Sequence, residues 1–314
     1  MRSRFIVYHR KHSTRQYRYT PGKRTLSNAM RTALTVLCMI GVVISGLQVV
    51  RFFADSQITR STNEAVASLY HEAEAPESSP AYAVRHGVTG MPLAAPTPAP
   101  ASVFQMIGES PLPRFKALLK ANPDVIGWLD IRGELDLPVV YRDNEYYLKR
   151  DVYHKKSTAG TLFLDENHPL AASAQYLVIH GHNMKDGSMF GHLQRYLELG
   201  YLEKHCIIQF DTLYQENTYV VFAVLVVSEN VHDAGFINFL GYPAFSSQEQ
   251  FMDFVNGLKD KSKFAIPVNV DASDALLTLS TCYGEERLII VARRVRSDES
   301  ASSLKSNVGY AIKR

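Results

Sequence analysis

The chain has 314 residues, of which 46% are hydrophobic and 21% charged, an ordinary composition for one sizeable domain with appendages or for two small domains. Its formal net charge of +3 is unevenly distributed: residues 1–31 hold nine lysines and arginines and no acidic residue, so the remainder carries a net charge of −6. Three cysteines are too few for a disulfide scaffold.

An apolar run, TALTVLCMIGVVISGLQVV, follows this basic segment and is uncharged until Arg51. Its length approaches the roughly 20 residues that a helix needs to cross a bilayer. A cleaved signal peptide has a similar pattern, but the long basic region and the long apolar run favour an uncleaved anchor. Basic residues before a span stay inside the cell. We therefore expect a cytoplasmic tail over 1–31, a transmembrane helix over 32–51 and an extracellular remainder. Topology accounts for the basic tail, so no nucleic-acid partner is expected.

Residues 52–112 are predicted to form a helical stalk, up to about residue 76, and then a Pro- and Ala-rich linker that holds the next domain away from the lipid. The folded domain is predicted over 113–296. It begins with a helix up to Lys120, which Asn122-Pro123 halts, and a strand from Val125. The polar residues 297–314 are expected to fray.

Short β-type runs dominate the rest of this domain and are bounded by Gly, Asn and Asp turn signals. They read LPVVY, GTLFLD, AQYLVIHG, CIIQFDT, NTYVVFAVLVVS, ALLTLSTC and RLIIVARRV. One segment, FSSQEQFMDFVNGLK, instead has apolar residues at helical spacing after a start typical of a capped helix. Many short strands with few helices indicate a mainly β fold, a closed or nearly closed barrel with peripheral helices.

Cys282 ends one apolar strand-like run, and Arg287 begins the next. Alternation puts Thr278, Ser280 and Cys282 on one relatively polar face, which is typical of a strand end that lines a cleft. If the two runs form a hairpin, the thiol and the guanidinium stand close together, where an arginine can stabilise negative charge on a substrate carbonyl. The alternative is a surface arginine paired with Glu285 or Glu286.

The other two cysteines are less suited to catalysis. Cys38 lies inside the predicted span, and Cys206 is flanked by β-branched residues that indicate a small buried hydrophobe. A nucleophilic thiol also needs a base, because the ordinary pKa of a free cysteine is about 8.5.

The segment LVIHGHNMKDGSMFGHL supplies three histidines, His180, His182 and His192. His180 and His182 are two positions apart and would share a strand face. They could therefore bind a metal ion together with His192, which is the alternative to one of them acting as a catalytic base. The cysteine favours the base, because a thiol nucleophile uses a histidine without a metal.

Taken together, these motifs resemble the class B sortases. TLSTC at 278–282 matches the TLxTC nucleophile motif of that family, RLIIVARRV matches its arginine-led strand, and GHNMKDGSMFG at 181–191 matches its histidine segment. The runs NPDVIGWLDI, LPVVYRDNEYYLKRD and GTLFLDENH resemble its opening strands, and FSSQEQFMDFVNGLK resembles its extra helix. The resemblance covers residues 113–296. Two departures are His180, directly before the Gly-His-Asn unit, and a short loop between the cysteine and the arginine.

The resemblance implies that Cys282 is the nucleophile, His182 the histidine and Arg287 the arginine of a cysteine transpeptidase that needs no cofactor and no metal. Ser280, Thr281 and Tyr283 are predicted to contact the substrate. Arg293 and Arg294 are interpreted as solvated or salt-bridged.

The implied reaction cuts an Asn-Pro-x-Thr-like C-terminal sorting signal of an exported protein through a thioester and transfers that protein to a peptidoglycan amine. The expected partners are signal-bearing surface proteins, the wall-precursor amine and the membrane that holds the enzyme. Two alternatives stay open at this stage. One is a pilin-polymerising sortase with a protein lysine as acceptor, and the other is a surface binding module without catalysis.

Overall fold

The computed structural model describes residues 28–72, 110–168, 174–242 and 244–314. Residues 1–27 of the predicted basic tail and residues 73–109 of the predicted linker lie outside these ranges. The chain divides into two compact units, Met1–Arg51 and Phe52–Arg314.

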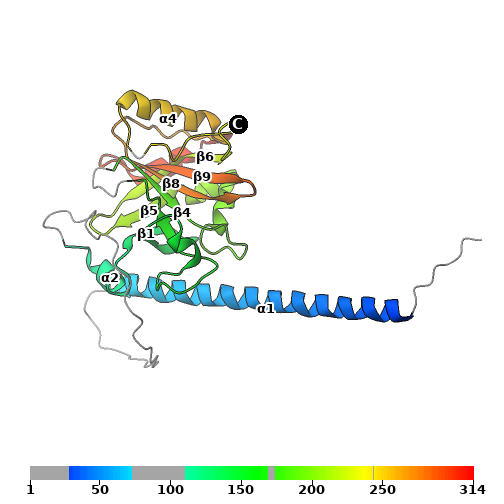
Figure 1. Cartoon of the computed structure of the whole chain (residues 1–314). Coiled ribbons are helices and arrows are strands. Elements are labelled where there is room, and N and C mark those ends of the chain that lie inside the picture. The colour runs from blue at the N-terminus through cyan, green and yellow to red at the C-terminus, as the bar shows by residue number, and fades with distance from the viewer. Residues whose placement is uncertain (1–27, 73–109, 169–173, 243) are drawn as a thin grey trace, which may run out of the picture. The chain divides into compact units, whose positions relative to one another are not determined.

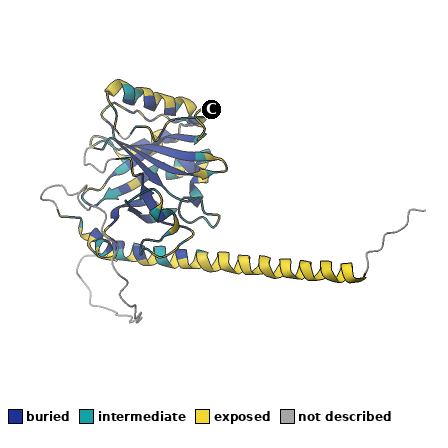
Figure 2. Ribbon diagram, viewed as in Figure 1, coloured by how far each residue is buried: buried dark blue, intermediate teal, exposed yellow. Residues whose placement is uncertain are grey.

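The first unit contains the beginning of helix α1, Asn28–Glu72. Its described residues are all exposed, apolar ones such as Leu37 and Val42 included, and they are yellow in Figure 2. Among the residues that the structure describes, α1 is the one helix long and apolar enough to cross a membrane. The predicted span and the predicted stalk are therefore parts of one continuous helix.

The second unit is built on a barrel, which closes in the order β1-β2-β3-β4-β8-β9-β6-β5 within the described residues (Figure 1). Neighbouring strands are antiparallel except for the parallel pairs β2·β3 and β4·β8. The strands are β1 Val125–Ile131, β2 Leu135–Val140, β3 Leu162–Leu164, β4 Tyr176–His180, β5 Ile207–Thr212, β6 Thr218–Val227, β8 Leu276–Tyr283 and β9 Glu286–Arg294. The predicted closed β-barrel is confirmed, and each predicted run contains a strand.

Helices lie outside the barrel. They are α2 Lys116–Ala121, α3 Leu199–His205, α4 Gln248–Lys261 and α5 Ala301–Val308, with short 3-10 helices at Pro113–Phe115, Tyr146–Lys149 and Gly191–Leu197. Helix α4 is the helix predicted from the apolar spacing. It begins at an N-cap, Ser247, whose side chain accepts a hydrogen bond from the Gln250 backbone N–H, and it buries Phe251, Phe254 and Leu258 near β6. In Figure 1 it lies at the end of the barrel where β6 and β9 are labelled.

The last turns of α1 belong to the core of the second unit. Val66 and Tyr70 are buried in a cluster with Phe115 and Trp128, and the rings of Tyr70 and Trp128 stack with centroids 4.2 Å apart. The Tyr70 hydroxyl also donates a hydrogen bond of 3.0 Å to Asp211 of β5. The helix predicted as a separate stalk thus packs on the barrel at its C-terminal end.

The C-terminal segment is ordered by a buried charge, so the prediction that it frays is wrong. The Arg293 guanidinium is fully buried and donates two 2.6 Å hydrogen bonds to the Glu299 carboxylate. These hydrogen bonds lower the pKa of Glu299. Burial of an unpaired charge is costly, so this ion pair holds the start of the segment on the barrel. Helix α5 then buries Leu304 and Val308, and β10 (Ile312–Lys313) pairs with β7 (Phe264–Ala265). The salt-bridged reading of Arg293 is confirmed.

Candidate active site

Strands β8 and β9 form a hairpin that places Cys282 directly opposite Arg287. Residues opposite each other in an antiparallel pair have Cβ atoms about 4.5–5.5 Å apart. The hairpin turns through Gly284-Glu285, and Gly284 has a φ of +65°, a conformation that glycine adopts without steric cost. The tight turn therefore keeps the thiol and the guanidinium side by side at one end of the barrel.

Exposure distinguishes the two cysteines of the second unit. Cys282 is exposed, whereas Cys206 is fully buried in the barrel core, as predicted. Burial raises the pKa of the Cys206 thiol to about 11, because a thiolate there would lose its hydration. Only Cys282 combines access to solvent with a neighbouring positive charge.

The segment that carries His182 is hydrogen-bonded along the end of the cysteine strand. Strand β4 runs parallel to β8, and beyond their last paired residues the contact continues through three hydrogen bonds. The Gly181 N–H donates to Ser280 O at 3.2 Å, the Thr281 hydroxyl donates to Gly181 O at 2.8 Å, and the Asn183 amide donates to Cys282 O at 2.8 Å. His182 is thus held in the segment immediately beside Cys282.

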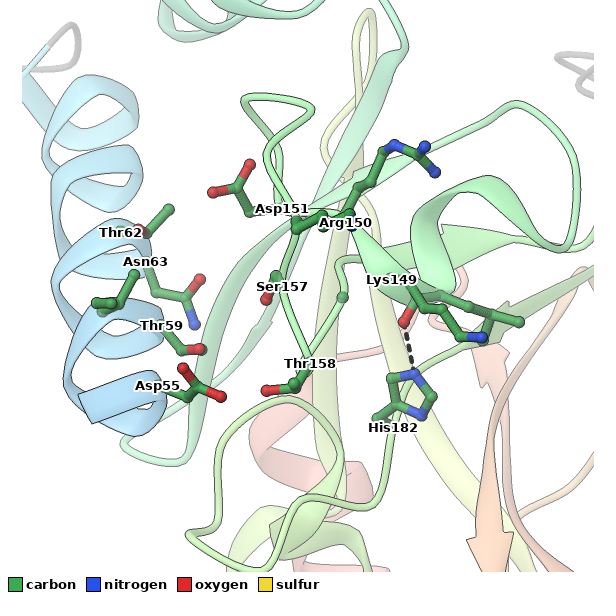
Figure 3. Close-up of a pocket in the computed structure, with 14 residues that line it drawn as sticks. Asp55, Thr59, Thr62, Asn63, Lys149, Arg150, Asp151, Ser157, Thr158 and His182 are labelled. Carbon is green, nitrogen blue, oxygen red and sulfur yellow. Dashed lines mark hydrogen bonds between the residues drawn. The ribbon is translucent and has the colours of Figure 1, made fainter. Parts of the chain in front are cut away.

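The imidazole of His182 is oriented by a backbone carbonyl. Its Nε2 lies 2.8 Å from Leu148 O, the contact drawn as a dashed line in Figure 3. A carbonyl oxygen only accepts hydrogen bonds, so Nε2 carries the hydrogen and Nδ1 is the nitrogen that can exchange a proton.

A glycine keeps that carbonyl in place. Gly160 has a φ of +64°, and a Cβ at this position would lie 2.5 Å from Tyr147 O and 2.9 Å from Leu148 O. Such distances are too short for a real contact, so no larger residue fits without displacing the carbonyl that bonds His182.

Arg287 has an acidic partner from a distant part of the sequence. Its Nε donates a 2.6 Å hydrogen bond to Glu229, which lies just after β6, and not to Glu285 or Glu286 of its own hairpin. Among the described residues the two terminal guanidinium nitrogens make no hydrogen bond. They are therefore available to donate hydrogen bonds to another group.

The three predicted substrate contacts differ in exposure. Ser280 and Thr281 are fully buried, and the Ser280 hydroxyl has no hydrogen-bond partner in the described part of the chain. Tyr283 is half-buried and packs against the edge of the core. Their role as substrate contacts stays a prediction.

His180 belongs to a buried polar cluster with Asp165 at its centre. The Asp165 carboxylate lies 2.8 Å from His168 Nδ1 and 3.1 Å from His180 Nε2, and it accepts a 2.9 Å hydrogen bond from the Asn144 amide. Burial by itself raises the pKa of Asp165, but hydrogen bonds from the two histidines outweigh it and hold this pKa well below its usual range. His180 thus contacts a carboxylate, whereas His182 contacts a backbone carbonyl.

The third histidine of the segment, His192, is 3.3 Å from the Glu134 carboxylate through Nδ1. His180, His182 and His192 therefore each have a different partner. The described residues contain no group of three or more His, Cys, Asp or Glu side chains arranged to hold a metal ion.

His182 also lines the end of a cavity of about 710 Å³. Figure 3 shows one wall made by helix α1, with Asp55, Thr59 and Asn63, and the facing wall made by the 148–160 segment, with Ser157. All of these residues belong to the second unit. Nothing in the sequence around α1 predicted that it forms part of this site.

Sequence reasoning missed two further residues. Asn183 directly follows His182 in the Gly-His-Asn unit, and this adjacency could have indicated that it belongs to the site. Glu229 is 58 positions from Arg287 in the sequence, and no local pattern connects them.

Comparisons with known proteins agree on one family. The family model described as Sortase domain matches residues 132–295. Sortase B of Listeria monocytogenes is 32% identical over 185 residues, which cover 57% of this chain and 72% of that protein. Sortase B of Staphylococcus aureus is 30% identical over 204 residues, covering 62% and 81%. The crystal structure of sortase B from Bacillus anthracis in complex with AAEK1 is similar at 25% identity and a TM-score of 0.60, covering 78% of this chain and 99% of that one.

Proposed function

This chain belongs to the sortase family, in class B, and is thus a sortase-type cysteine transpeptidase; from that premise we propose that Cys282 is its nucleophile, His182 its proton carrier and Arg287 its oxyanion-binding residue. The observation that carries this proposal is the pairing of Cys282 with Arg287 across the β8–β9 hairpin, beside the segment that holds His182.

In the first half of the reaction, the Cys282 thiolate attacks a backbone carbonyl of the sorting signal. The Arg287 guanidinium hydrogen-bonds the tetrahedral oxyanion. His182 gives a proton from Nδ1 to the departing amine, while Leu148 O holds its Nε2–H. The signal is cut, and the surface protein remains on the enzyme as a thioester.

In the second half, an amine attacks the thioester and the protein is released on its new carrier. We propose an Asn-Pro-x-Thr-like signal and a peptidoglycan amine, both by analogy with the class. Ser280, Thr281 and Tyr283 remain the proposed substrate contacts. In this proposal His182 carries the proton transfers and Arg287 stabilises the developing negative charge.

We also propose that α1 anchors the enzyme in the cell membrane, with the basic N-terminus in the cytoplasm and the catalytic unit outside. The exposed apolar surface of α1 before Arg51 and the nine basic residues of the N-terminal segment support this topology. An anchored enzyme meets a membrane-tethered substrate and a lipid-linked acceptor at raised effective concentration.

The test uses the full chain in detergent micelles with an Asn-Pro-x-Thr signal peptide and a stem-type peptide amine, and products are separated by mass. We expect Cys282→Ala and His182→Ala to abolish cleavage, whereas His180→Ala only weakens it. Equal loss from the two histidine variants together with bound zinc would support a metal site instead.

Two outcomes would replace this function. Coupling to a pilin lysine in preference to the peptide amine would make the enzyme a pilin polymerase. Resistance of Cys282 to an exposed-thiol reagent, with unchanged function of Cys282→Ala, would make the chain a binding module.

A further inference from the structure

Helix α1 is clamped to the barrel on both sides of the cavity that His182 lines. On one side, the Ser56 hydroxyl donates a hydrogen bond of 2.5 Å to Asp186, which lies in the loop that follows His182. On the other side, Val66 and Tyr70 are buried in the core. The helix between these contacts forms a fixed wall of the cavity.

This wall presents polar groups that the protein itself leaves unused. Thr59 is only 8% exposed, yet its hydroxyl makes no hydrogen bond to any described residue, and Figure 3 shows it directed toward Ser157 and Thr158 on the facing wall. The neighbouring Asn63 amide also has no partner in the described chain. The Thr59 hydroxyl is not among the buried atoms that lack a partner, so it is open to the cavity and available to hydrogen-bond a ligand there.

Both signs of charge line the cavity. Asp55 has no ion pair or hydrogen bond among the described residues, and Asp151 lies on the opposite wall (Figure 3). Lys149 and Lys156 add positive charge, whereas the Arg150 guanidinium is occupied by the Tyr146 ring at 4.3 Å. A short peptide with one ammonium and one carboxylate matches this lining. The volume of about 710 Å³ is in the range of small-ligand sites, about 300–1,000 Å³.

We propose that this cavity is the acceptor site, where a short amine-bearing peptide binds between α1 and the 148–160 segment with its amine toward His182. The inference rests on the proposed function and names the place from which the second substrate enters. It favours a short peptide over a lysine on a folded protein, because a cavity of about 710 Å³ lined by charges of both signs offers contacts along a whole small ligand and not to one side chain alone.

The position suits the chemistry of the second step. A neutral amine nitrogen attacks the thioester carbon, a C–N bond forms, and the C–S bond breaks with its electron pair on sulfur. The proton lost by the amine passes to His182 Nδ1, so the step ends with an amide, a Cys282 thiolate and an imidazolium. The amine must therefore approach from the side where His182 is accessible, and His182 lines this cavity.

The test measures partition between two products. The full chain in detergent micelles is given an Asn-Pro-x-Thr signal peptide and increasing amounts of a stem-type tetrapeptide with one free side-chain amine, and hydrolysed and transferred products are quantified by mass. Thr59→Val removes the hydroxyl and keeps the shape, so we expect the acceptor KM to rise about threefold to tenfold, the effect of one lost hydrogen bond. Asn63→Phe fills the cavity, so we expect a rise above about tenfold and a product ratio shifted toward hydrolysis.

Matched controls lie on the same helix, where Ala65→Phe adds bulk at an exposed position outside the cavity and Ser61→Ala removes an exposed hydroxyl. Both should keep the wild-type acceptor KM and product ratio.

An unchanged acceptor KM in Thr59→Val and Asn63→Phe, or parallel loss of the hydrolysed and the transferred product, overturns the acceptor site alone. Preferred use of a lysine on a folded protein also overturns it. Absence of any Cys282-dependent cleavage by the wild-type chain overturns the proposed function and this site with it.

Discussion

The side-chain amide of Asn183 donates a 2.8 Å hydrogen bond to the backbone carbonyl of Cys282. The residue after the proposed catalytic histidine is thereby bonded to the residue that carries the proposed nucleophile. This contact is one of three hydrogen bonds that hold the segment after β4 beside the end of β8, although these two segments are about 100 positions apart in the chain.

Asn183→Ala should therefore slow catalysis more than it destabilises the fold. Loss of the hydrogen bond lets the histidine segment move, and we expect kcat for signal cleavage to fall about tenfold, while the peptide KM stays within about twofold. Asn183→Gln should recover part of the rate. The exposed Asn256→Ala on α4 is the matched control. A purely structural role predicts equal loss of stability and rate, with no rescue by glutamine.

Glu229→Ala should release the Arg287 guanidinium without unfolding the protein. The Glu229 side chain is 59% exposed, and exposed ion pairs contribute only about 0–1 kcal/mol to stability. We expect an unchanged melting temperature and a kcat reduced about threefold to tenfold, because the guanidinium is no longer held toward the oxyanion. Glu229→Gln should keep most of the activity, and Glu285→Ala in the hairpin turn is the control. Identical kinetics in Glu229→Ala and wild type would show that Arg287 needs no positioning.

Gly160→Ala should disturb His182 from a distance. The added Cβ would collide with the Tyr147 and Leu148 carbonyls, so we expect a stability loss of about 1–3 kcal/mol and a shifted pH profile of kcat, since Leu148 O bonds the imidazole. Gly133→Ala is a close control: Gly133 also has a positive φ, +79°, but beyond its chain neighbours no described atom lies within 4 Å of the position that an alanine Cβ would take. A shifted pH profile in both variants would point to backbone strain in general and not to the Leu148 carbonyl.

Asp165→Asn should change the pH dependence of stability. The folded protein holds the pKa of Asp165 below its ordinary value of 3.8, so ionised Asp165 stabilises the fold above about pH 4, and this contribution disappears as the pH falls. We expect the variant to be about 2–4 kcal/mol less stable at pH 6, with the difference shrinking below pH 4, as measured by urea unfolding. The exposed Asp260→Asn should show no such difference. A constant gap between variant and wild type across this pH range would contradict the assignment.

The local sequence was sufficient to predict the strands of the barrel and the proximity of Cys282 and Arg287. Alternating apolar residues specify a strand, and a glycine turn joins two such runs into a hairpin, so that Cys282 and Arg287 had to become neighbours once β8 and β9 paired. Helix α4 could likewise be predicted from the local sequence, because Phe251 and Leu258 recur at helical spacing. The local sequence failed for the C-terminal segment, because nothing near Glu299 in the sequence shows that Arg293 is buried and needs a partner.

The sequence by itself determined that this chain is a class B sortase with an apolar N-terminal helix, since strand periodicity, turn glycines and the TLSTC unit are all encoded within short stretches. Only the tertiary structure decided which carbonyl orients His182, which carboxylate bonds Arg287 and that α1 forms a cavity wall. Those contacts join residues 34 to 130 positions apart. Closure of the barrel and docking of α1 bring them together, and no local preference of the backbone specifies such distant partners.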